Sequence, residues 1–459
     1  MRVVSALLLL ACSAAAVAVE TPPAPSAPKN FEVPAKSERT LPNGMQLTFV
    51  AFGSIPKTAL TAVVRTGNLN EGNNTWLADL TGELMKEGAG KRDANQIAEA
   101  AASMGGSVNL SVGPDQTSVS LDVLSEHGED ALGLIADLLR RPTLPESELP
   151  RIKRDFGRQL ALSRSEPDSL ANEAFLALLY PNHPYGKLYP TDAQLAGYSI
   201  DQVRGYHSAN FGAARTHLYV AGRFDRAKIE QAIERAFADW PAGPAPLVNP
   251  PSGVSKRQLK LIDRPGAPQS TIFLGLPAID PSQADYLQLS LTNSLLGGEF
   301  SSRITSNIRE NKGYAYSPQS SVNVQYRNGY WLQEADVTTE HTGDSLKEIF
   351  GEIERLQREP PSSAELTGMK NYRAGIFVLQ NATRGALIGQ LAFMDLHGLP
   401  DDYLTHLVER IYAITPDQVS AAARKYVRPQ DMTLVIVGDL AKVRPQLAKV
   451  PQLKGLSLQ

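Results

Sequence analysis

The segment WLADLTGELMKEGAGKR (76–92) decides how this chain is interpreted. Its apolar residues recur at a spacing of four, at Trp76, Leu80 and Leu84, and this spacing predicts an amphipathic helix. Asn74 or Thr75 is expected to cap the start of the helix. Gly88, which tolerates a left-handed conformation, is expected to end it. The apolar face of this helix should lie in the core of a folded domain.

Asp79 and Glu83 form a second stripe on the same helix, because they too are four residues apart. Two side chains in this relation can hold a metal ion from one face of a helix, but zinc would favour histidines there. Two carboxylates suit a hard cation better, and an acidic surface stripe is the simpler interpretation. The helix therefore carries either an unusual metal site or the remains of a site that has lost its metal.

The composition favours a folded protein of more than one domain. The chain has 459 residues, of which 42% are hydrophobic and 20% are charged. Lys and Arg total 45 and Asp and Glu total 48, which gives a net charge of −3. A balance this close to neutrality gives no reason to expect a nucleic acid or an anionic membrane surface as a partner.

The first twenty residues, MRVVSALLLLACSAAAVAVE, are typical of a secretory signal peptide, because one Arg precedes a short apolar run and small residues follow it. Two cleavage sites compete: an A-x-A-type site at 16–18, and a lipoprotein-like site that would leave Cys12 lipidated. Cys12 is the only cysteine, so the mature chain can form no internal disulfide. No other stretch is apolar for long enough to span a bilayer. We expect an exported, periplasmic protein, with a lipid anchor at Cys12 as the alternative to a soluble chain.

Two Pro-rich stretches divide the rest of the sequence. TPPAPSAPKNFEVPAKS (21–37) is expected to be an extended tether, and PAGPAPLVNPPSG (241–253) an interdomain linker. The predicted domains are therefore residues 38–240 and 254–459.

The ends of the two domains are similar in sequence. SIDQVRGYHSANFGAARTHLYVAGRFD (199–225) aligns with TPDQVSAAARKYVRPQDMTLVIVGDLA (415–441), so that Gly222 matches Gly438 at an offset of 438 − 222 = 216. A second matched pair is ELPRIKRDF (148–156) and ELTGMKNYR (365–373). Each of the longer copies predicts a helix, a turn and a buried strand. Matching order at a nearly constant offset indicates duplication of a whole domain.

The first domain mixes strands and helices. Its apolar patterns predict strands at 45–50 and 60–64, a β-hairpin at 108–123 that turns at Gly113, and helices at 129–141 and 146–177. A further helix is expected to begin at Asp93, which forms a capping box with Gln96. Hairpins with grouped helices indicate an α+β fold. Each of the two homologous domains should contain a largely antiparallel sheet covered by helices.

Four motifs in this frame resemble those of the pitrilysin/insulinase superfamily of zinc metallopeptidases. They are LPNGMQL (41–47), the helix pair at 76–105 that ends in SMGGSVN, LLYPNHPYG (178–186) and IRENKGYAYS (308–317). The resemblance covers residues 36–445 and is closest to the short, two-domain branch of bacterial and processing peptidases. It implies a duplicated α+β fold.

The resemblance also locates a zinc site that this chain lacks. Active members carry an inverted motif, H-x-x-E-H, and a distant Glu; the two His and the distant Glu hold zinc, while the Glu of the motif is the general base. The corresponding positions here are Asp79, Gly82, Glu83 and Gln159, with Gly82 at the position of the base. All four differ from the motif, so we expect no zinc and no catalytic residue on this chain alone.

Arg309 and Tyr316 do match the family pattern. The resemblance implies that they project toward the substrate from the second domain, where Arg can fork to a peptide carbonyl and a phenol can donate to a developing oxyanion. Gly313 lies between them, so we expect Arg309 at a helix end and Tyr316 on the following strand. The alternative is a solvated Arg and a Tyr buried in the core.

In the short branch two chains often divide these roles, and this chain resembles the partner that lacks the zinc motif. We therefore expect a non-catalytic, substrate-binding subunit of an exported zinc metallopeptidase heterodimer, inactive alone, that assists peptide hydrolysis by a zinc-bearing sister chain. Zinc, the expected cofactor, would then belong to the sister chain. Two alternatives stay open: a binding or scaffold protein without proteolytic function, and an enzyme that uses another metal arrangement.

Overall fold

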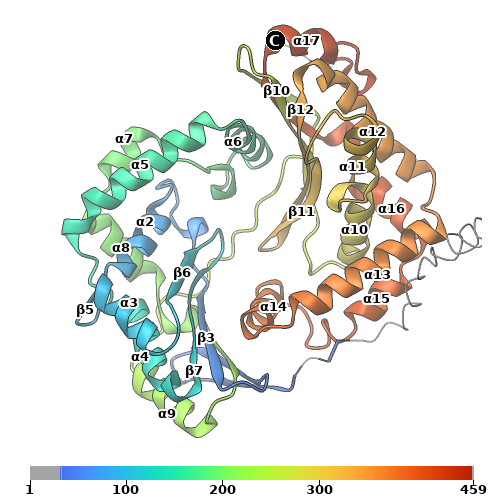
Figure 1. Cartoon of the computed structure of the whole chain (residues 1–459). Helices are drawn as coiled ribbons and strands as arrows, with labels where there is room; N and C mark the ends of the chain where they lie inside the picture. The colour runs from blue at the N-terminus through green and yellow to red at the C-terminus, as the bar shows by residue number, and fades with distance from the viewer. Residues whose placement is uncertain (1–30, 33, 457–459) are drawn as a thin grey trace, which may run out of the picture.

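The computed structural model describes residues 31–32 and 34–456, which fold into two similar halves (Figure 1). The predicted signal peptide, with Cys12 and both cleavage sites, lies outside the described residues, as does the predicted tether up to residue 30. Among the described helices, none is both long enough and apolar enough to cross a membrane.

The first half combines strands and helices in mixed order. Its strands are β1 (Lys36–Thr40), β2 (Gln46–Ala51), β3 (Lys57–Val64), β4 (Gly88–Ala89), β5 (Arg92–Asp93), β6 (Asn109–Val112), β7 (Thr117–Leu124) and β8 (Thr216–Gly222). Its α-helices are α2 (Leu77–Lys86), α3 (Ala94–Ser103), α4 (Gly128–Arg140), α5 (Leu149–Ser165), α6 (Pro167–Leu179), α7 (Asp192–Gly197), α8 (Ile200–Asn210) and α9 (Arg226–Phe237).

The second half repeats this order with fewer strands. Its strands are β9 (Gln258–Asp263), β10 (Gln269–Ala278), β11 (Gln319–Gln325), β12 (Asn328–Thr338) and β13 (Thr433–Gly438). Its α-helices are α10 (Tyr286–Asn293), α11 (Arg303–Thr305), α12 (Thr342–Arg358), α13 (Ser363–Gln380), α14 (Arg384–His397), α15 (Leu407–Ala413), α16 (Pro416–Tyr426) and α17 (Leu440–Leu447). Two π-helical segments, η6 (Ser294–Gly298) and η7 (Ser306–Asn311), flank α11.

The two main sheets have the same topology. The first has the strand order β1-β2-β8-β3-β7-β6, and the second has the order β9-β13-β10-β12-β11. When β1 is left out, β2, β8, β3, β7 and β6 occupy the same positions in the first sheet as β9, β13, β10, β12 and β11 do in the second. The outer pairs β2–β8 and β9–β13 are parallel, and the other neighbouring strands are antiparallel. The predicted α+β class and the predicted duplication are therefore both confirmed.

The repeated sequence motif folds alike in both halves. In α8 the side chain of Ser199 accepts from the backbone N–H of Gln202, and in α16 Thr415 does the same for Gln418. Both are capping boxes, in which the glutamine side chain also bonds back to the backbone of the cap residue. Each helix is followed by the buried strand that the sequence predicts, β8 or β13.

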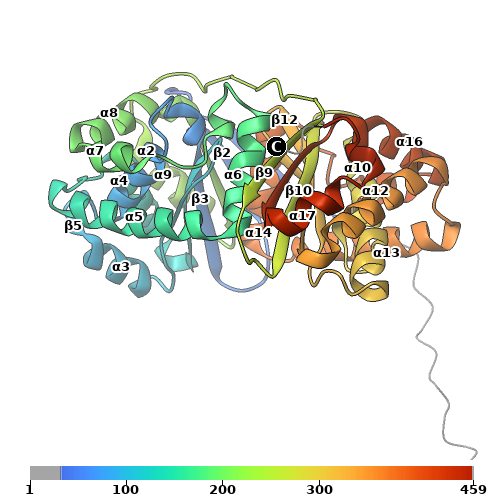
Figure 2. The same ribbon diagram turned by 90° about the horizontal axis from the view of Figure 1, so that it is seen from above.

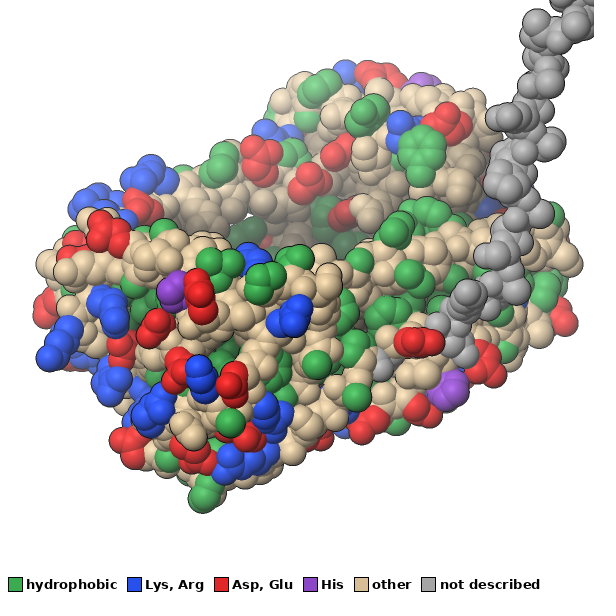
Figure 3. Space-filling view, turned by 60° about the horizontal axis from the view of Figure 1, so that its bottom comes forward, with side chains coloured by type: hydrophobic (Ala, Val, Ile, Leu, Met, Phe, Trp, Pro, Cys, Tyr) green, Lys and Arg blue, Asp and Glu red, His purple; other side chains and the backbone are tan. Residues whose placement is uncertain are grey.

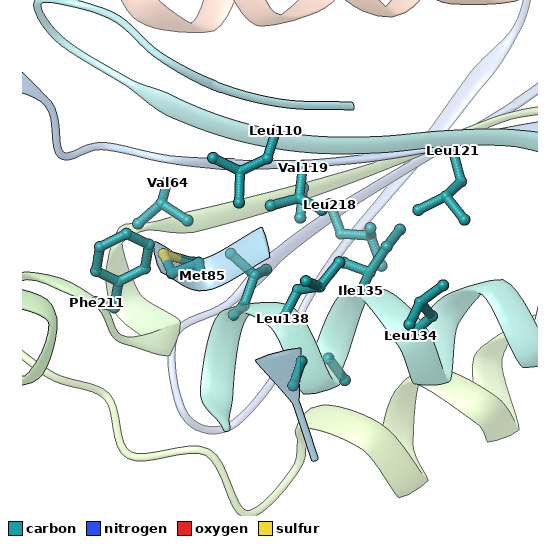
Figure 4. Packing of buried hydrophobic residues seen from close by; sticks show 14 of the residues in the cluster. Val64, Met85, Leu110, Val119, Leu121, Leu134, Ile135, Leu138, Phe211 and Leu218 are labelled. Atoms are coloured by element: carbon teal, nitrogen blue, oxygen red, sulfur yellow. The ribbon is translucent and has the colours of Figure 1, made fainter. Parts of the chain in front are cut away.

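The predicted hairpin forms and buries one face against helices. β6 and β7 pair antiparallel, and alternate residues of β7, such as Val119 and Leu121, are buried. Figure 4 shows Leu134, Ile135 and Leu138 of α4 packed against the apolar side of this sheet. Burial of side chains of this size stabilises the fold by about 1.5–3 kcal/mol each. The sequence periodicity therefore identified the face that forms the core.

The opposite face of each sheet is covered by one helix of the other half. Phe175 and Leu179 of α6 pack on the second sheet, against Phe273 of β10. Reciprocally, Leu387 and Leu391 of α14 pack on the first sheet. In Figures 1 and 2 both helices lie between the halves. This exchange, which the sequence analysis did not predict, joins the two halves through apolar burial.

Some predicted boundaries were wrong. The helix expected over 146–177 is two helices, α5 and α6, because Pro167 lacks an N–H and disfavours a helical conformation at Glu166. The strand expected at 60–64 begins at Lys57, since its pairing with β7 extends to that residue.

Other ends also differ from expectation. α2 ends at Lys86, and Gly88 belongs to the short strand β4; the left-handed conformation occurs at Gly90, where φ is +62°. β1 includes Lys36 and Ser37, the last two residues of the segment expected to be a tether. These two residues pair with β2 and extend the first sheet.

Candidate functional site

The start of α2 is built differently from the sequence prediction. Neither Asn74 nor Thr75 caps the helix; the cap position is Trp76, whose φ of +69° lies in the left-handed region that few large residues adopt. The side-chain oxygens of Glu71 accept from the backbone N–H groups of Trp76 (3.1 Å) and Ala78 (3.0 Å). A side chain five residues before the cap position therefore satisfies N–H groups at the start of the helix.

Glu71, which is buried, and Asp79, which is half-buried, form an acidic pair bridged by an amide. The Nδ2 of Asn68 donates to Oδ2 of Asp79 (2.6 Å) and lies 3.5 Å from Oε2 of Glu71. Burial raises the pKa of Glu71 to about 8, and the nearby charge of Asp79 contributes. Burial also raises the pKa of Asp79, with a smaller contribution from Glu83. Asp79 is thus part of the support at the start of α2 and does not lie on an exposed acidic stripe.

The other two motif positions on α2, Gly82 and Glu83, lie in different environments. Glu83 forms an ion pair with Lys86 (2.6 Å) near the surface. Gly82 is buried against β6, and a Cβ placed on it would lie 2.6 Å from Cγ2 of Val112 and 3.2 Å from Cδ2 of Leu110. A side chain at the position where active relatives would carry the base therefore requires Val112 to shift.

Replacing Gly82 by Ala is expected to lower the free energy of unfolding by about 2 kcal/mol, because it overpacks the contact between α2 and β6. Combining it with Val112→Ala should recover most of this loss. The matched control is Gly157→Ala in α5, where a Cβ meets nothing within 4 Å; it should be neutral or stabilising, since Ala favours a helix. Urea titrations measure all three variants. Equal stability of Gly82→Ala and the native chain would contradict the steric account.

Gln159 lies on α5 with an exposed side chain. α5 is nevertheless held close to the start of α2, because Phe156 packs on Trp76 with ring centroids 5.5 Å apart. Tyr189 also contacts Trp76, with ring centroids 5.8 Å apart. Helix α5 is therefore placed where it could supply the distant zinc ligand, but its residue at that position is Gln159, an exposed amide.

The four positions do not fit zinc. Asp79 is engaged by Asn68, Gly82 has no side chain, Glu83 pairs with Lys86 and Gln159 is a neutral amide. Within residues 31–32 and 34–456, no group of three or more His, Cys, Asp or Glu side chains is arranged to hold a metal ion. This donor set lacks the imidazoles that make a zinc site.

Arg309 and Tyr316 are brought together in the second half. Arg309 lies in η7, and its guanidinium carbon is 5.1 Å from the centroid of the Tyr316 ring. Gly313, with a φ of +67°, turns the chain between them. Tyr316 precedes β11 in a bend rather than lying on the strand as expected, and its side chain is 77% exposed. The alternative of a core tyrosine is therefore wrong.

A cavity of about 1020 Å³ lies between the first sheet and α14. Its sheet side carries hydroxyl groups such as those of Ser111 and Ser118, and its helix side is apolar, with Ile388 and Phe393. It lies beside β6, an edge strand whose outer backbone groups have no partner strand in the described chain. Figure 3 shows that the molecule is hollowed between its halves. Lys57 and Asp122, which pair with each other at 3.5 Å, also line the cavity.

Two family models match the chain. The model described as insulinase (peptidase family M16) matches residues 54–189, and the model described as peptidase M16 inactive domain matches residues 198–372. Among curated proteins, an uncharacterized zinc protease of Bacillus subtilis is 24% identical over 87% of this chain and 97% of that protein. Another, from Rickettsia felis, is 24% identical over 74% of this chain and 82% of that protein.

Solved structures show the same likeness. The structure described as a peptidase M16 inactive domain from Pseudomonas fluorescens superposes with a TM-score of 0.82 and 26% identity, over 88% of this chain and 98% of that one. A protease from Helicobacter pylori superposes with a TM-score of 0.82 and 18% identity, over 89% of this chain and 100% of that one. The second match supports the fold alone.

Proposed function

The chain belongs to the insulinase (M16) family of peptidases, and from this premise we propose that it is the non-catalytic, substrate-binding subunit of an exported zinc peptidase heterodimer. Such a complex would degrade or process peptides. The observation that carries the proposal is a contrast within one chain. The residues at the zinc positions do not form a zinc site, whereas the Arg309/Tyr316 pair is assembled, with the Tyr316 ring exposed.

The state of the zinc positions supports a subunit without its own catalytic centre. General-base catalysis at a bound water needs a carboxylate at position 82, where Gly82 has no side chain and packs closely against Val112. Asp79 has been recruited to stabilise the start of α2 instead. The fold is kept by its hydrophobic cores, which do not depend on a metal.

Two surfaces support the proposed binding of substrate. Arg309 offers N–H groups to a peptide carbonyl, and Tyr316 offers a phenol O–H close to the same point. The cavity beside β6 offers an edge strand to which an extended peptide can add by backbone hydrogen bonds. Both surfaces recognise peptide backbone rather than one particular side chain, as expected of a chain that handles many peptides.

The partner and the location are inferred from what the chain lacks and how it begins. A chain that offers substrate-binding groups without a catalytic centre needs a second chain to supply one, and a zinc-bearing M16 sister chain has the complementary parts. The leader at residues 1–20 supports export to the periplasm, and Cys12 leaves a lipid anchor as the alternative to a soluble chain.

A second candidate function is a binding or scaffold protein that has no proteolytic partner. The cavity of about 1020 Å³ is compatible with it, because peptide could be held there without being cleaved. The two candidates differ in one respect: only the first requires a sister chain with the H-x-x-E-H motif.

The purified chain alone is expected neither to hold zinc after dialysis nor to hydrolyse peptides. The reason is the donor set, in which Asp79, Gly82, Glu83 and Gln159 replace two imidazoles, the base and a carboxylate. Metal analysis and a peptidase assay with and without a chelator test this. One zinc per chain, or hydrolysis that the chelator abolishes, would favour a self-sufficient enzyme and end the subunit proposal.

A further inference from the structure

Two exposed aromatic rings enclose Arg309. The guanidinium carbon lies 4.4 Å from the ring centroid of Phe300 and 5.1 Å from that of Tyr316. Phe300 is 64% exposed and Tyr316 is 77% exposed, although rings of this size are usually buried. Both rings therefore meet one cation at the surface. We call Phe300, Arg309 and Tyr316 the aromatic clamp.

The clamp leaves the hydrogen-bonding end of Arg309 available. Its Nε lies 3.1 Å from Oε1 of Glu310, and its side chain is 27% exposed. Among the described residues, no hydrogen bond engages either terminal nitrogen. Stacking on two rings fixes the plane of the guanidinium, so less conformational entropy is lost when it binds an acceptor. The two terminal nitrogens of Arg309 can therefore donate to a carbonyl or a carboxylate.

Phe300 is positioned from both sides. Before it, Glu299 lies 3.6 Å from the guanidinium of Arg373 on α13. After it, Ser302 is buried and its hydroxyl bonds to that of Thr305 (3.0 Å). The backbone of this short loop is thus anchored while the Phe300 ring itself stays exposed. An anchored loop that presents an exposed ring is typical of a contact surface.

We propose that Phe300 is a third substrate-contacting residue, and that the aromatic clamp selects peptides with a large apolar side chain beside the carbonyl or carboxylate bound by Arg309. The inference rests on the proposed substrate-binding function. The two ring centroids lie 4.4 Å and 5.1 Å from the guanidinium carbon, so a side chain next to a carbonyl bound by Arg309 would lie beside a ring. An apolar side chain would cover a ring there, whereas a basic side chain would be repelled by Arg309.

The test uses the isolated full chain and three fluorescein-labelled hexapeptides, AALAAA, AASAAA and AAKAAA, which differ at one position. Fluorescence anisotropy gives each dissociation constant. The native chain is expected to bind the Leu peptide about five- to tenfold more tightly than the Ser peptide, and the Lys peptide most weakly. Phe300→Ala should reduce the affinity for the Leu peptide to that for the Ser peptide, and Phe300→Leu should retain part of the preference.

The matched control is Leu162→Ala, which removes a 61% exposed apolar side chain from α5 in the other half and should change nothing. Thermal unfolding confirms that each variant is folded. If the peptides bind but Phe300→Ala keeps the native preference, the clamp proposal is overturned and the substrate-binding proposal stands. If the native chain binds none of the peptides, while a reconstituted heterodimer cleaves them as well with Arg309→Ala as without it, both proposals fall.

Discussion

Replacing Tyr316 by Phe is expected to lower kcat of the reconstituted heterodimer about 100- to 1,000-fold, while assembly and KM change little. The Tyr316 ring is 77% exposed and lies 5.1 Å from the Arg309 guanidinium carbon, so we expect its phenol O–H to donate to the oxyanion that develops as a peptide bond is attacked. Loss of one such donor typically costs about 3–4 kcal/mol of transition-state stabilisation. Steady-state kinetics on a gel-filtered complex measure the effect.

Arg309→Ala should raise KM as well as lower kcat, because a forked contact to the substrate backbone is made before and during the reaction. A structural role predicts another pattern: lower thermal stability or failed assembly, with normal turnover in whatever complex forms. Assembly, melting temperature and kinetics must therefore be measured on the same preparation. A well-assembled Tyr316→Phe complex with native kcat would end the catalytic-assistance proposal.

The second large effect concerns pH and the buried carboxyl of Glu71. Its pKa is raised from 4.5 to about 8 in the folded chain, so the protonated form is favoured by folding. The stability that this proton confers is complete below pH 4.5 and is lost as the pH rises through 8. At about 1.4 kcal/mol per pH unit, the native chain should lose about 3 kcal/mol more than Glu71→Gln between pH 5 and pH 7.5.

The comparison uses slopes, because the amide of Glu71→Gln also alters the cap that Glu71 gives to Trp76 and Ala78. Urea titrations at half-unit steps of pH give the two curves. Glu83→Gln is the control, since Glu83 pairs with Lys86 near the surface and acts on Glu71 only through Asp79; this variant should keep most of the native slope. Parallel curves for the native chain and Glu71→Gln would show that Glu71 does not hold a proton in the folded state.

Local patterns predicted the parts of the fold that depend on neighbours in sequence. The alternation around Val119 and Leu121 identified a hairpin and its buried face. The capping box of Asp93 and Gln96 identified the start of α3. The repeated Asp-Gln-Val motif revealed the duplication, because both copies keep the same cap and the same buried strand.

Contacts between distant residues could not be predicted in this way. Nothing near Phe175 indicates that α6 covers the sheet of the other half, since an apolar helix face does not specify the surface on which it packs. Glu71 caps α2 from a loop, where no periodicity exists. The tertiary fold also brings Gly82 against Val112, 30 positions along the chain. It places Phe300 against Arg309, 9 positions along the chain, which is not a spacing that puts two residues on one face of a helix. The resemblance therefore located the site and predicted the loss of its zinc ligands, whereas the contacts around these positions were visible only in the structure.

The central claim is that this chain works as one half of a peptidase. Native mass spectrometry of the complex purified from its own host, through a tag on this chain, tests it most directly. We expect an equimolar assembly with an M16 sister chain that carries H-x-x-E-H, and one zinc ion per pair. A chain that is recovered alone, or that retains zinc without a sister chain, would contradict the claim.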